Sequence, residues 1–426
     1  MKDLVKIAWR NIWRNKRRTF ITAASILFAV LLSVLMNAIQ KGAWDKMVDN
    51  VVNFYYGYGQ IHSKGYWDEQ SIDKAFELEP AMAQLDTDKS DVPPVVPRLE
   101  SFALAYYAKD TVRMVDGNLQ PDTLRNSRGV LVVGTSPSAE QEMTHLANRL
   151  VGGRYLEEGA NEILVAEGIM EKMKMSIGDS LVLISQGYHG VNAVGKYPVV
   201  GVVKFGSPEL NKQIVYLPLK TAQRFYGTPN LVTGLALNIS KKDAAPHVLQ
   251  TVRKELPEDT YEVMSWQEMM PDLVEAQQMD TAGNYIVLVI LYIIIAFGIF
   301  GTILMMTKER EYEFGILTAI GMNRRSLSFS IWLEIVMLGL IGAAAGILVS
   351  LPIVYYFHVN PLDFGEMSEQ MAETYEKFGF EPVFPAAFDF NIFMNHTLVV
   401  LLITTVLAIY PTLKIMRLKP VEAMRH

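Results

Sequence analysis

Tyr285-Ile-Val-Leu-Val-Ile-Leu-Tyr-Ile-Ile-Ile-Ala-Phe-Gly-Ile-Phe-Gly-Thr-Ile-Leu-Met-Met306 is a run of mostly apolar side chains that contains no charge. A helix that crosses the hydrocarbon core of a membrane, about 30 Å thick, needs about 20 predominantly apolar residues. This stretch meets that length, so it predicts a membrane-spanning helix.

Three other segments repeat the pattern, namely Phe20–Ala38, Phe329–Ile353 and Thr397–Tyr410. The last has a shorter core, but apolar residues continue to Leu413 before Lys414 ends the run. Hydrophobic residues make up 50% of the chain and the mean hydropathy is +0.17, which exceeds what a soluble core of this size needs. We therefore expect an α-helical membrane protein with four transmembrane helices.

A basic start followed by an apolar run can also be a cleavable secretory signal. Here the apolar run is longer than a typical signal core, and Asn37-Ala-Ile-Gln-Lys-Gly42 offers no small-x-small cleavage site. We expect the first span to stay in place as an anchor. The chain has no cysteine, which excludes disulfides and thiolate metal sites.

The distribution of charge predicts the orientation, although the net charge of −6 does not. Segments on the cytoplasmic side of a span are enriched in lysine and arginine. Three segments have this enrichment: Arg10, Arg14, Lys16, Arg17 and Arg18; Lys308, Arg310, Arg324 and Arg325; Lys414, Arg417, Lys419 and Arg425. The segment between the third and fourth spans is acidic, with Asp363, Glu366, Glu369, Glu373, Glu376, Glu381 and Asp389 against Lys377. Both termini are therefore expected in the cytoplasm.

The chain between Gln40 and Asn284 is long enough for one large or two small domains outside the membrane. Strand-like runs bounded by glycine and proline alternate there with helical segments. The runs are Ser180–Ser185, Tyr197–Lys204 and Gln213–Pro218, the helical segments are Ala139–Leu150 and Leu249–Glu255, and Asp91–Pro97 reads as an irregular connector. We expect a mixed α+β domain.

Both ends of this domain look helical and continuous with the spans. Lys41–Val52 extends the first span outward, and Ser265-Trp-Gln-Glu268 fits a capping box that starts a helix. From there the chain can continue through Pro271 into the second span. Such stalks are either rigid levers that transmit motion or plain spacers, and both interpretations stay open.

The sequence contains no familiar catalytic motif. The chain lacks a phosphate-binding loop of the G-x-x-x-x-G-K-[ST] type and the H-E-x-x-H and G-x-S-x-G patterns. Its histidines have no metal-ligand spacing. We expect neither ATP hydrolysis by this route nor a metal site on this chain.

A short segment after the second span combines charge, apolar residues and glycines: Lys308-Glu-Arg-Glu-Tyr-Glu-Phe-Gly-Ile-Leu-Thr-Ala-Ile-Gly-Met-Asn-Arg-Arg325. It is expected to follow the span without a break. Its apolar patch, Phe314, Ile316, Leu317 and Ile320, is either a docking surface for another protein or the buried side of an interfacial helix.

This segment resembles the FtsX-like and MacB-type permeases of ABC transporters, which include the lipoprotein-releasing permeases of the LolC/LolE-like branch. The family pattern E-R-x-x-E-I-G-I-L-x-A-[LI]-G is matched by Glu309, Arg310, Glu313, Gly315, Ile316, Leu317, Ala319, Ile320 and Gly321, with Phe314 in place of the usual isoleucine and Thr318 where a basic residue is common. The resemblance implies that these residues form the coupling helix that docks on a separate ATPase subunit.

Further matches spread along the chain. They are the basic amphipathic start Ala8–Thr19, then Gly153-Arg-Tyr, Glu162–Val165 and Gly178-Asp179 in the outer domain, Glu334 in the third span, and the ending Pro420–Arg425. The region from about 63 to 127 matches no motif. The resemblance implies a MacB-type periplasmic core domain between the first two spans.

Glu334 is an ionisable group inside a span, which makes it a functional candidate. It acts either in helix packing and switching or as a side chain that reaches interfacial water. Small residues, Gly342 and Gly346 on the third span and Gly298 and Gly301 on the second, predict close helix contacts within the bundle or across a dimer.

The resemblance implies a permease of the bacterial inner membrane that pairs with a second copy or a homologous permease and with ABC ATPase subunits, which carry the ATP and Mg. It favours extraction of lipoproteins or lipids; the alternatives are efflux of small molecules or peptides with a periplasmic adaptor and FtsX-like activation of a cell-wall hydrolase. No nucleic acid partner is expected. The expected organisation is a cytoplasmic N-terminal helix at 1–18, spans at 19–40, 284–306, 328–355 and 396–413, the outer domain with stalks at 41–283, the coupling helix at 307–327, an acidic loop at 356–395 and a cytoplasmic tail at 414–426.

Overall fold

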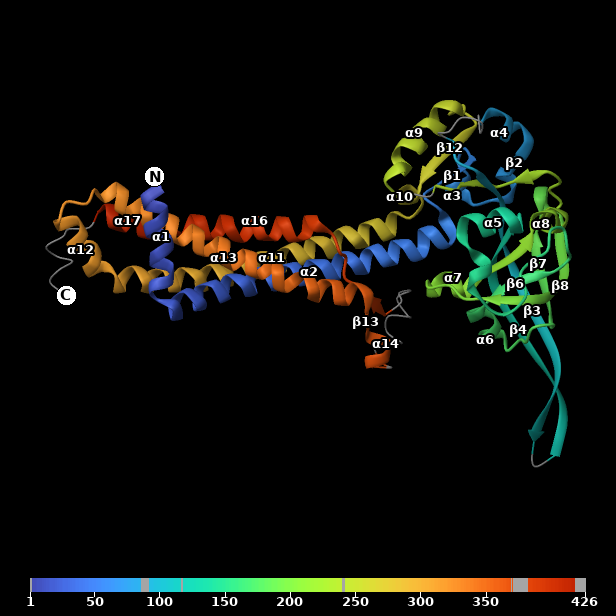
Figure 1. The fold of residues 1–426 in the computed structure, drawn as a ribbon. Coiled ribbons are helices and arrows are strands. Elements are labelled where there is room, and N and C mark those ends of the chain that lie inside the picture. Colours follow the sequence, from blue (N-terminus) through green and yellow to red (C-terminus); the bar gives the residue numbers. More distant parts are fainter. Residues whose placement is uncertain are drawn as a thin grey trace. The chain divides into compact units, whose positions relative to one another are not determined.

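The computed structural model describes residues 2–85, 92–115, 118–239, 242–368, 370 and 382–417. The chain folds into two compact units (Figure 1). The helical unit comprises Met1–Lys46, Ala276–Asp363 and Val383–His426, and the α+β unit comprises Met47–Glu275 and Phe364–Pro382.

Four helices of the described chain are long and apolar enough to cross a membrane, in the segments Thr19–Tyr56, Pro271–Glu309, Arg324–Val359 and Phe390–Met416. This confirms the predicted class of four membrane-spanning helices. The elements of the helical unit are α1 (Lys2–Arg14), α2 (Lys16–Val51), α11 (Pro271–Glu309), α12 (Glu311–Ala319), α13 (Arg324–Val359), β13 (Leu362–Asp363), β14 (Val383–Phe384), α16 (Phe390–Leu407) and α17 (Ile409–Met416). A shared apolar core joins the four long helices, with Ile26, Ile299, Ile335 and Val400 among its buried residues.

The fourth span is longer than its apolar core because α17 continues it. α16 ends at Leu407 and α17 begins at Ile409, two residues before Pro411. Proline has no N–H to donate to the preceding turn, so a helix boundary near this position is expected. Asp389 caps the start of α16 by accepting a hydrogen bond from the Asn391 N–H at 2.9 Å.

The α+β unit is built on one large mixed sheet. Its strands are β1 (Gly59–Ser63), β3 (Val95–Val115), β4 (Asn118–Thr135), β5 (Leu150–Gly153), β6 (Ile163–Ala166), β7 (Ser180–Gln186), β8 (Asn192–Val203), β9 (Ile214–Pro218), β11 (Gly234–Leu237) and β12 (Tyr261–Ser265). They are ordered β12-β1-β11-β3-β4-β9-β6-β8-β5, and β7 pairs with β3 and β8. The strands β2 (Phe76–Glu77) and β10 (Leu231–Val232) pair separately.

Short helices connect these strands. They are η1 (Val52–Tyr56), α3 (Tyr66–Glu69), η2 (Ile72–Lys74), α4 (Leu78–Gln84), α5 (Pro137–Thr144), η3 (Leu146–Arg149), α6 (Glu167–Met173), η4 (Tyr188–Gly190), α7 (Pro208–Gln213), α8 (Leu219–Tyr226), η5 (Lys242–Ala244), α9 (Ala245–Glu255), α10 (Trp266–Met269) and α14 (Phe364–Met367). The predicted strands at 180–185, 197–204 and 213–218 and the helix at 249–255 are confirmed. The helix predicted over 139–150 is instead split into α5 and η3, because His145 adopts a left-handed backbone between them.

The longest strands form a hairpin in the region that matched no motif. β3 and β4 pair antiparallel from Arg98–Thr135 out to Val115–Asn118 and extend well past the rest of the sheet (Figure 1). Its first strand also corrects the expected connector at 91–97. Val95–Pro97 belong to β3 because they pair with Leu235–Leu237 of β11, while Asp91 lies outside the described residues.

The predicted capping box is present, but it starts only a short helix. The Ser265 side chain accepts a hydrogen bond from the Glu268 N–H, and Glu268 accepts one from the Ser265 N–H at 2.7 Å. α10 then ends at Met269, Met270 leaves the helical conformation, and α11 begins at Pro271. The expected continuous helix is therefore wrong at this point, since a residue before proline is pushed away from helical angles.

The residues of the G-R-x and E-I-x-[IV] motifs connect the end of β5 to the start of β6. Arg154 follows β5 and makes a two-point contact with Glu162, just before β6. Gly153 has φ +79°, and a Cβ there would meet the Val200 carbonyl oxygen at 2.2 Å, so only glycine fits. These residues therefore serve the fold of the α+β unit.

Candidate functional site

The candidate coupling segment contains a helix break that the sequence did not predict. α11 ends at Glu309, and Arg310 leaves the helix with φ −99° and ψ 4° before α12 begins. A second turn closes α12 at Gly321, whose φ of +107° requires glycine, and the Asn323 side chain then caps α13 through the Arg325 N–H at 3.0 Å. The expectation that this segment continues the second span without a break is wrong, because the chain turns at Arg310.

The turn at Arg310 aims its guanidinium at Glu334, so two residues singled out separately in the sequence form one ion pair. The Arg310 Nη1 atom lies 2.8 Å from Glu334 Oε1 and 2.9 Å from Oε2. Glu334 is 4% exposed and Arg310 is 12% exposed. Removing one partner of such a buried pair leaves an uncompensated buried charge, which is strongly destabilising. Arg310 and Glu334 therefore depend on each other.

Helix α1 supplies a second layer around this pair. The Asn11 amide donates to Glu334 Oε2 at 3.3 Å, and Arg14 Nη2 lies 2.5 Å from a Glu313 carboxylate oxygen. Arg310 Nε also lies 3.5 Å from Glu313. The Arg14 hydrogen bond holds the pKa of Glu313 below its usual range. Glu313 therefore faces two guanidinium groups, one from α1 and one from the turn.

A cavity of about 270 Å³ opens beside these groups. Its lining residues come from α1, the start of α2, the end of α11, α12 and α13: Asn11, Arg14, Asn15, Thr19, Met306, Glu309, Arg310, Glu313 and Glu334. The cavity has room for water. The Arg310–Glu334 pair thus has protein on one side and an accessible polar space on the other. We call these residues the coupling network.

The two sides of α12 differ in exposure. Phe314 is 2% exposed, lies under the Arg310 guanidinium at 5.2 Å, and belongs to the core of the helical unit, and Gly315 is buried beside it. Leu317 is 40% and Ile320 80% exposed, Ala319 and Gly321 are exposed, and Ile316 is half-buried. Phe314 was expected on the exposed apolar patch, and this is wrong because its ring anchors α12 to the bundle.

The glycines of the third span pack inside this chain. A Cβ on Gly342 would meet the Ile26 Cβ at 2.7 Å, and one on Gly346 would meet the Val30 Cβ at 2.7 Å. Close approach of α13 to α2 therefore requires both glycines. At Gly298 and Gly301 of α11, an added Cβ would have no neighbour within 4 Å among the described residues.

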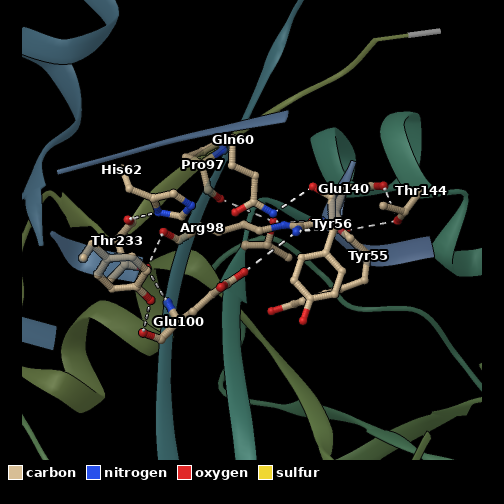
Figure 2. A network of polar contacts seen from close by, with 12 residues as sticks. Tyr55, Tyr56, Gln60, His62, Pro97, Arg98, Glu100, Glu140, Thr144 and Thr233 are labelled. Carbon is tan, nitrogen blue, oxygen red and sulfur yellow. Dashed lines mark hydrogen bonds and ion pairs between the residues drawn. The ribbon is translucent and has the colours of Figure 1, made fainter. Parts of the chain in front are cut away.

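A second buried ion pair lies in the α+β unit, beside η1, the short helix that follows α2 (Figure 2). Arg98 of β3 binds Glu140 of α5 at two points, through Nε at 3.0 Å and Nη2 at 2.7 Å. Its Nη1 donates to the Tyr55 carbonyl of η1 at 2.6 Å. Thr135 and Thr144 donate hydroxyl hydrogen bonds to the Glu140 carboxylate at 3.0 Å and 3.1 Å. We call this cluster the stalk root.

The stalk root is sealed from solvent. Arg98 is 1% exposed and Glu140 is fully buried. Glu100 lies 3.8 Å from Arg98, and burial raises its pKa. Nearby, the ring of His62 meets the Thr233 carbonyl at 2.8 Å, and burial lowers the pKa of His62 to about 4. Arg98 and Glu140 gave no sequence signal, because neither lies in a recognisable motif.

The sequence also missed the contribution of Asn11 and Arg14 to the coupling network. For the Arg310–Glu334 pair a partial signal was present, because an ionisable residue in a span needs a partner of opposite charge. This signal does not single out Arg310 from the other basic residues between the spans. Among the described residues, no group of three or more His, Asp or Glu could hold a metal ion. The charged side chains of the coupling network can exchange partners and hold α1, α12 and α13 in position.

Residues 285–420 match the FtsX-like permease C-terminal model, and residues 19–255 match the MacB-like periplasmic core domain. The second match alone covers more than half of the chain. The chain belongs to the FtsX-like permeases with a MacB-like periplasmic core domain. This FtsX-like permease is therefore an ABC transporter permease of the FtsX/MacB type, and the α+β unit between α2 and α11 is its periplasmic domain.

The relatives are distant. The lipoprotein-releasing system transmembrane protein LolC of Neisseria meningitidis is 22% identical over 312 residues, covering 70% of this chain and 74% of its own length. The macrolide export ATP-binding/permease protein MacB of Escherichia coli is 21% identical over 365 residues, covering 82% of this chain and 52% of its own. The crystal structure of the periplasmic region of MacB from Actinobacillus actinomycetemcomitans covers 54% of this chain and 95% of its own, at 13% identity and a TM-score of 0.33.

Proposed function

We propose that this FtsX-like permease is the transmembrane subunit of a transporter whose separate ATPase subunits bind ATP and Mg²⁺ and dock on α12. The observation that carries the proposal is the two-sided character of α12. Phe314 and the Arg310–Glu334 pair hold its inner side to the bundle, and Leu317 and Ile320 leave an apolar outer side exposed. A helix built in this way can receive a push from a bound partner and pass it to the third span.

The proposed path of motion uses the helices that run into the periplasmic domain. α2 and α11 are tied to each other near the outer end of the bundle, where Asp280 accepts hydrogen bonds from Trp44 at 2.6 Å and from Gln40 at 2.9 Å. α2 then ends in η1, which Arg98 and Glu140 clamp to the sheet. In this mechanism, these contacts transmit movement of α2 to the periplasmic domain.

The proposed orientation places α1, α12 and the C-terminal segment in the cytoplasm of a bacterial cell, with the permease in the inner membrane. Lysine and arginine gather in these segments, and the positive-inside rule favours that side. A second copy or a homologous permease would complete the transporter. Because an added Cβ at Gly298 or Gly301 of α11 would have no neighbour within 4 Å in the described chain, that helix offers a small-residue face for it.

The proposed substrate class is lipoproteins or lipids that leave the outer face of the inner membrane. Support comes from the LolC relatives, whose alignment covers most of both chains. The alignment with MacB favours export of a small molecule as the second candidate, because it covers 82% of this chain. The two candidates differ in what would copurify with the permease.

The first experiment purifies the tagged permease in a mild detergent, identifies copurifying proteins and lipids by mass spectrometry, and measures ATP hydrolysis by the complex. We expect an ABC ATPase and a lipoprotein or lipid. Ile320→Asp should abolish recovery of the ATPase without changing membrane insertion, because it puts a charge on the exposed apolar side of α12. Val191→Asp, an equally drastic change at an exposed residue of the periplasmic domain, should retain it. ATPase recovery that is unchanged in Ile320→Asp would remove α12 as the docking helix.

A further inference from the structure

Helix α1 has a second surface that neither the coupling network nor the bundle covers. α1 ends at Arg14, only Asn15 separates it from α2, and α2 is the first spanning helix. α1 packs against α13 and lies across the end of the bundle (Figure 1). A helix attached in this way to the start of a span lies at the boundary between membrane and water.

Besides the face that carries Ile7, Asn11 and Arg14, three stripes of side chains run along α1. Ala8 and Ile12 are buried against the bundle. Val5, Trp9 and Trp13 are spaced four residues apart, which places them on one face, and all three are exposed. The two indole rings contact each other edge to face, with centroids 5.9 Å apart. An aligned stripe of this kind is unusual on a surface that meets only water.

A third stripe is basic. Lys6 and Arg10 follow the aromatic stripe around the helix and are exposed. Across residues 2–18 the sequence carries seven basic residues, Lys2, Lys6, Arg10, Arg14, Lys16, Arg17 and Arg18, against the single acidic residue Asp3. Tryptophan prefers the interface between lipid and water, and clustered lysine and arginine attract anionic headgroups. The adjoining stripes therefore match a bilayer surface that carries negative charge.

We propose that α1 is a lipid-binding helix, whose Val5, Trp9 and Trp13 enter the interface while Lys6 and Arg10 bind anionic phospholipid headgroups of the same membrane. The consequence reaches the coupling network, because Arg14 on α1 binds Glu313 and Asn11 binds Glu334. Anionic lipid holds α1 in place, and α1 holds α12. This consequence for coupling rests on the proposed function, whereas the binding of lipid does not.

The chain contains no cysteine, so a single introduced cysteine can carry a fluorescent probe without background. Trp9→Cys places the probe on the aromatic stripe, and Ile7→Cys is a matched control. Ile7 is 43% exposed against 45% for Trp9, but the two lie on opposite sides of the helix because successive residues turn by about 100°. Val5→Cys provides a second stripe position if Trp9→Cys lowers the yield.

The labelled full-length permease is placed in nanodiscs of phosphatidylcholine that contain a bromine-labelled lipid, which quenches a probe in contact with its chains. We expect strong quenching at residues 9 and 5 and little at residue 7. Bromine-labelled phosphatidylglycerol, diluted in phosphatidylcholine, should quench residue 9 more than bromine-labelled phosphatidylcholine does. The local enrichment should be about fivefold per basic side chain, which corresponds to about 1 kcal/mol.

Lys6→Gln with Arg10→Gln should make the two brominated lipids equally effective, whereas Lys220→Gln with Lys254→Gln, at exposed positions of the periplasmic domain, should preserve the difference. Equal quenching at residues 7 and 9 would overturn the proposal, as would equal quenching by both lipids in the unaltered protein. ATP hydrolysis by the complex is measured in the same nanodiscs. Preferred binding of anionic lipid without any effect on hydrolysis would contradict the coupling role and leave the lipid-binding helix in place.

Discussion

Two buried arginine–glutamate pairs, one in each unit, differ in how completely they are enclosed. In the stalk root, all three guanidinium nitrogen atoms of Arg98 donate hydrogen bonds, two to Glu140 and one to the Tyr55 carbonyl. Both side chains of the pair are inaccessible to water. In the coupling network, Arg310 holds Glu334 through one nitrogen atom at 2.8 Å and has Glu313 at 3.5 Å as a second acidic neighbour. A polar cavity adjoins this second pair.

The two pairs are therefore suited to different roles. The first acts as a joint, a contact that stays fixed, and the second acts as a switch, a contact that can change partners. The enclosed pair has no water at hand to replace a lost contact, and the other acidic side chain near Arg98, Glu100 at 3.8 Å, is buried in the same cluster. The pair therefore holds η1, β3 and α5 in one arrangement. Arg310 instead has a second carboxylate, Glu313, that is 43% exposed, and the adjoining cavity has room for water, so this pair can exchange partners at lower cost. We infer that the stalk root stays fixed during the transport cycle, while the contacts of Arg310 change.

The largest effect is expected from breaking the joint. Arg98→Met leaves the Glu140 carboxylate buried without a counter-charge, and the cost of such a change is about 3–5 kcal/mol. Thermal unfolding of the purified permease should show a large loss of stability or no folded protein. The double variant Arg98→Met with Glu140→Leu removes both charges of the pair and leaves the buried Glu100 without its cationic neighbour, so it should recover part of this loss. A single variant as stable as the unaltered protein would show that the pair is not a clamp.

A glutamate-to-glutamine substitution in each pair compares how much the two pairs contribute to the free energy of unfolding. Glu140→Gln should lower the free energy of unfolding nearly as much as Arg98→Met does. Glu334→Gln should cost about 1–2 kcal/mol, because Arg310 can turn to Glu313 and to water in the cavity. ATP hydrolysis by the complex should nevertheless become independent of substrate in Glu334→Gln, since the third span loses its charged link to α12. Equal losses of stability in the two variants would contradict the distinction between joint and switch.

The smallest effect is expected at the outer layer of the coupling network. Arg14→Gln removes a partly exposed pair with Glu313, which is worth less than about 1 kcal/mol. Because Arg14 lowers the pKa of Glu313, the stability that this pair contributes is present above the ordinary glutamate pKa and is lost as pH falls through the lowered value. The variant and the unaltered protein should therefore differ in thermal stability at neutral pH and converge in strong acid. A difference that grows on acidification would have the wrong sign.

Much of the membrane architecture was predictable from the sequence because it depends on local composition. The apolar runs at 20–38, 285–306 and 329–353 each lie inside one long helix of the structure. Lipid contact requires only that most side chains be apolar, so no knowledge of neighbours is needed. Helix ends were less predictable. The breaks at Met270 and Arg310 were missed. The first follows from Pro271, which is visible in the sequence, whereas no sequence pattern marks the second.

The pairing of residues was beyond the sequence, even where the residues were noticed. Arg310 and Glu334 were both candidates, yet nothing in their spacing showed that the chain turns to bring them together. Gly342 and Gly346 indicated close packing but did not reveal that Ile26 and Val30 of the same chain were their neighbours. Phe314 lies within an exposed-looking motif and is buried, because the turn at Arg310 rotates α12 toward the bundle.

The sequence by itself determined that this is a four-span permease with a large α+β domain, because apolar length, charge distribution and family motifs are properties of contiguous residues. Only the tertiary structure decided which charges are paired and which are accessible. Arg98 meets Glu140 through a strand and a helix that are 42 positions apart, and Asn11 meets Glu334 across most of the chain. Such contacts depend on how separate elements pack, and the energy of a buried charge depends on the surroundings that this packing creates.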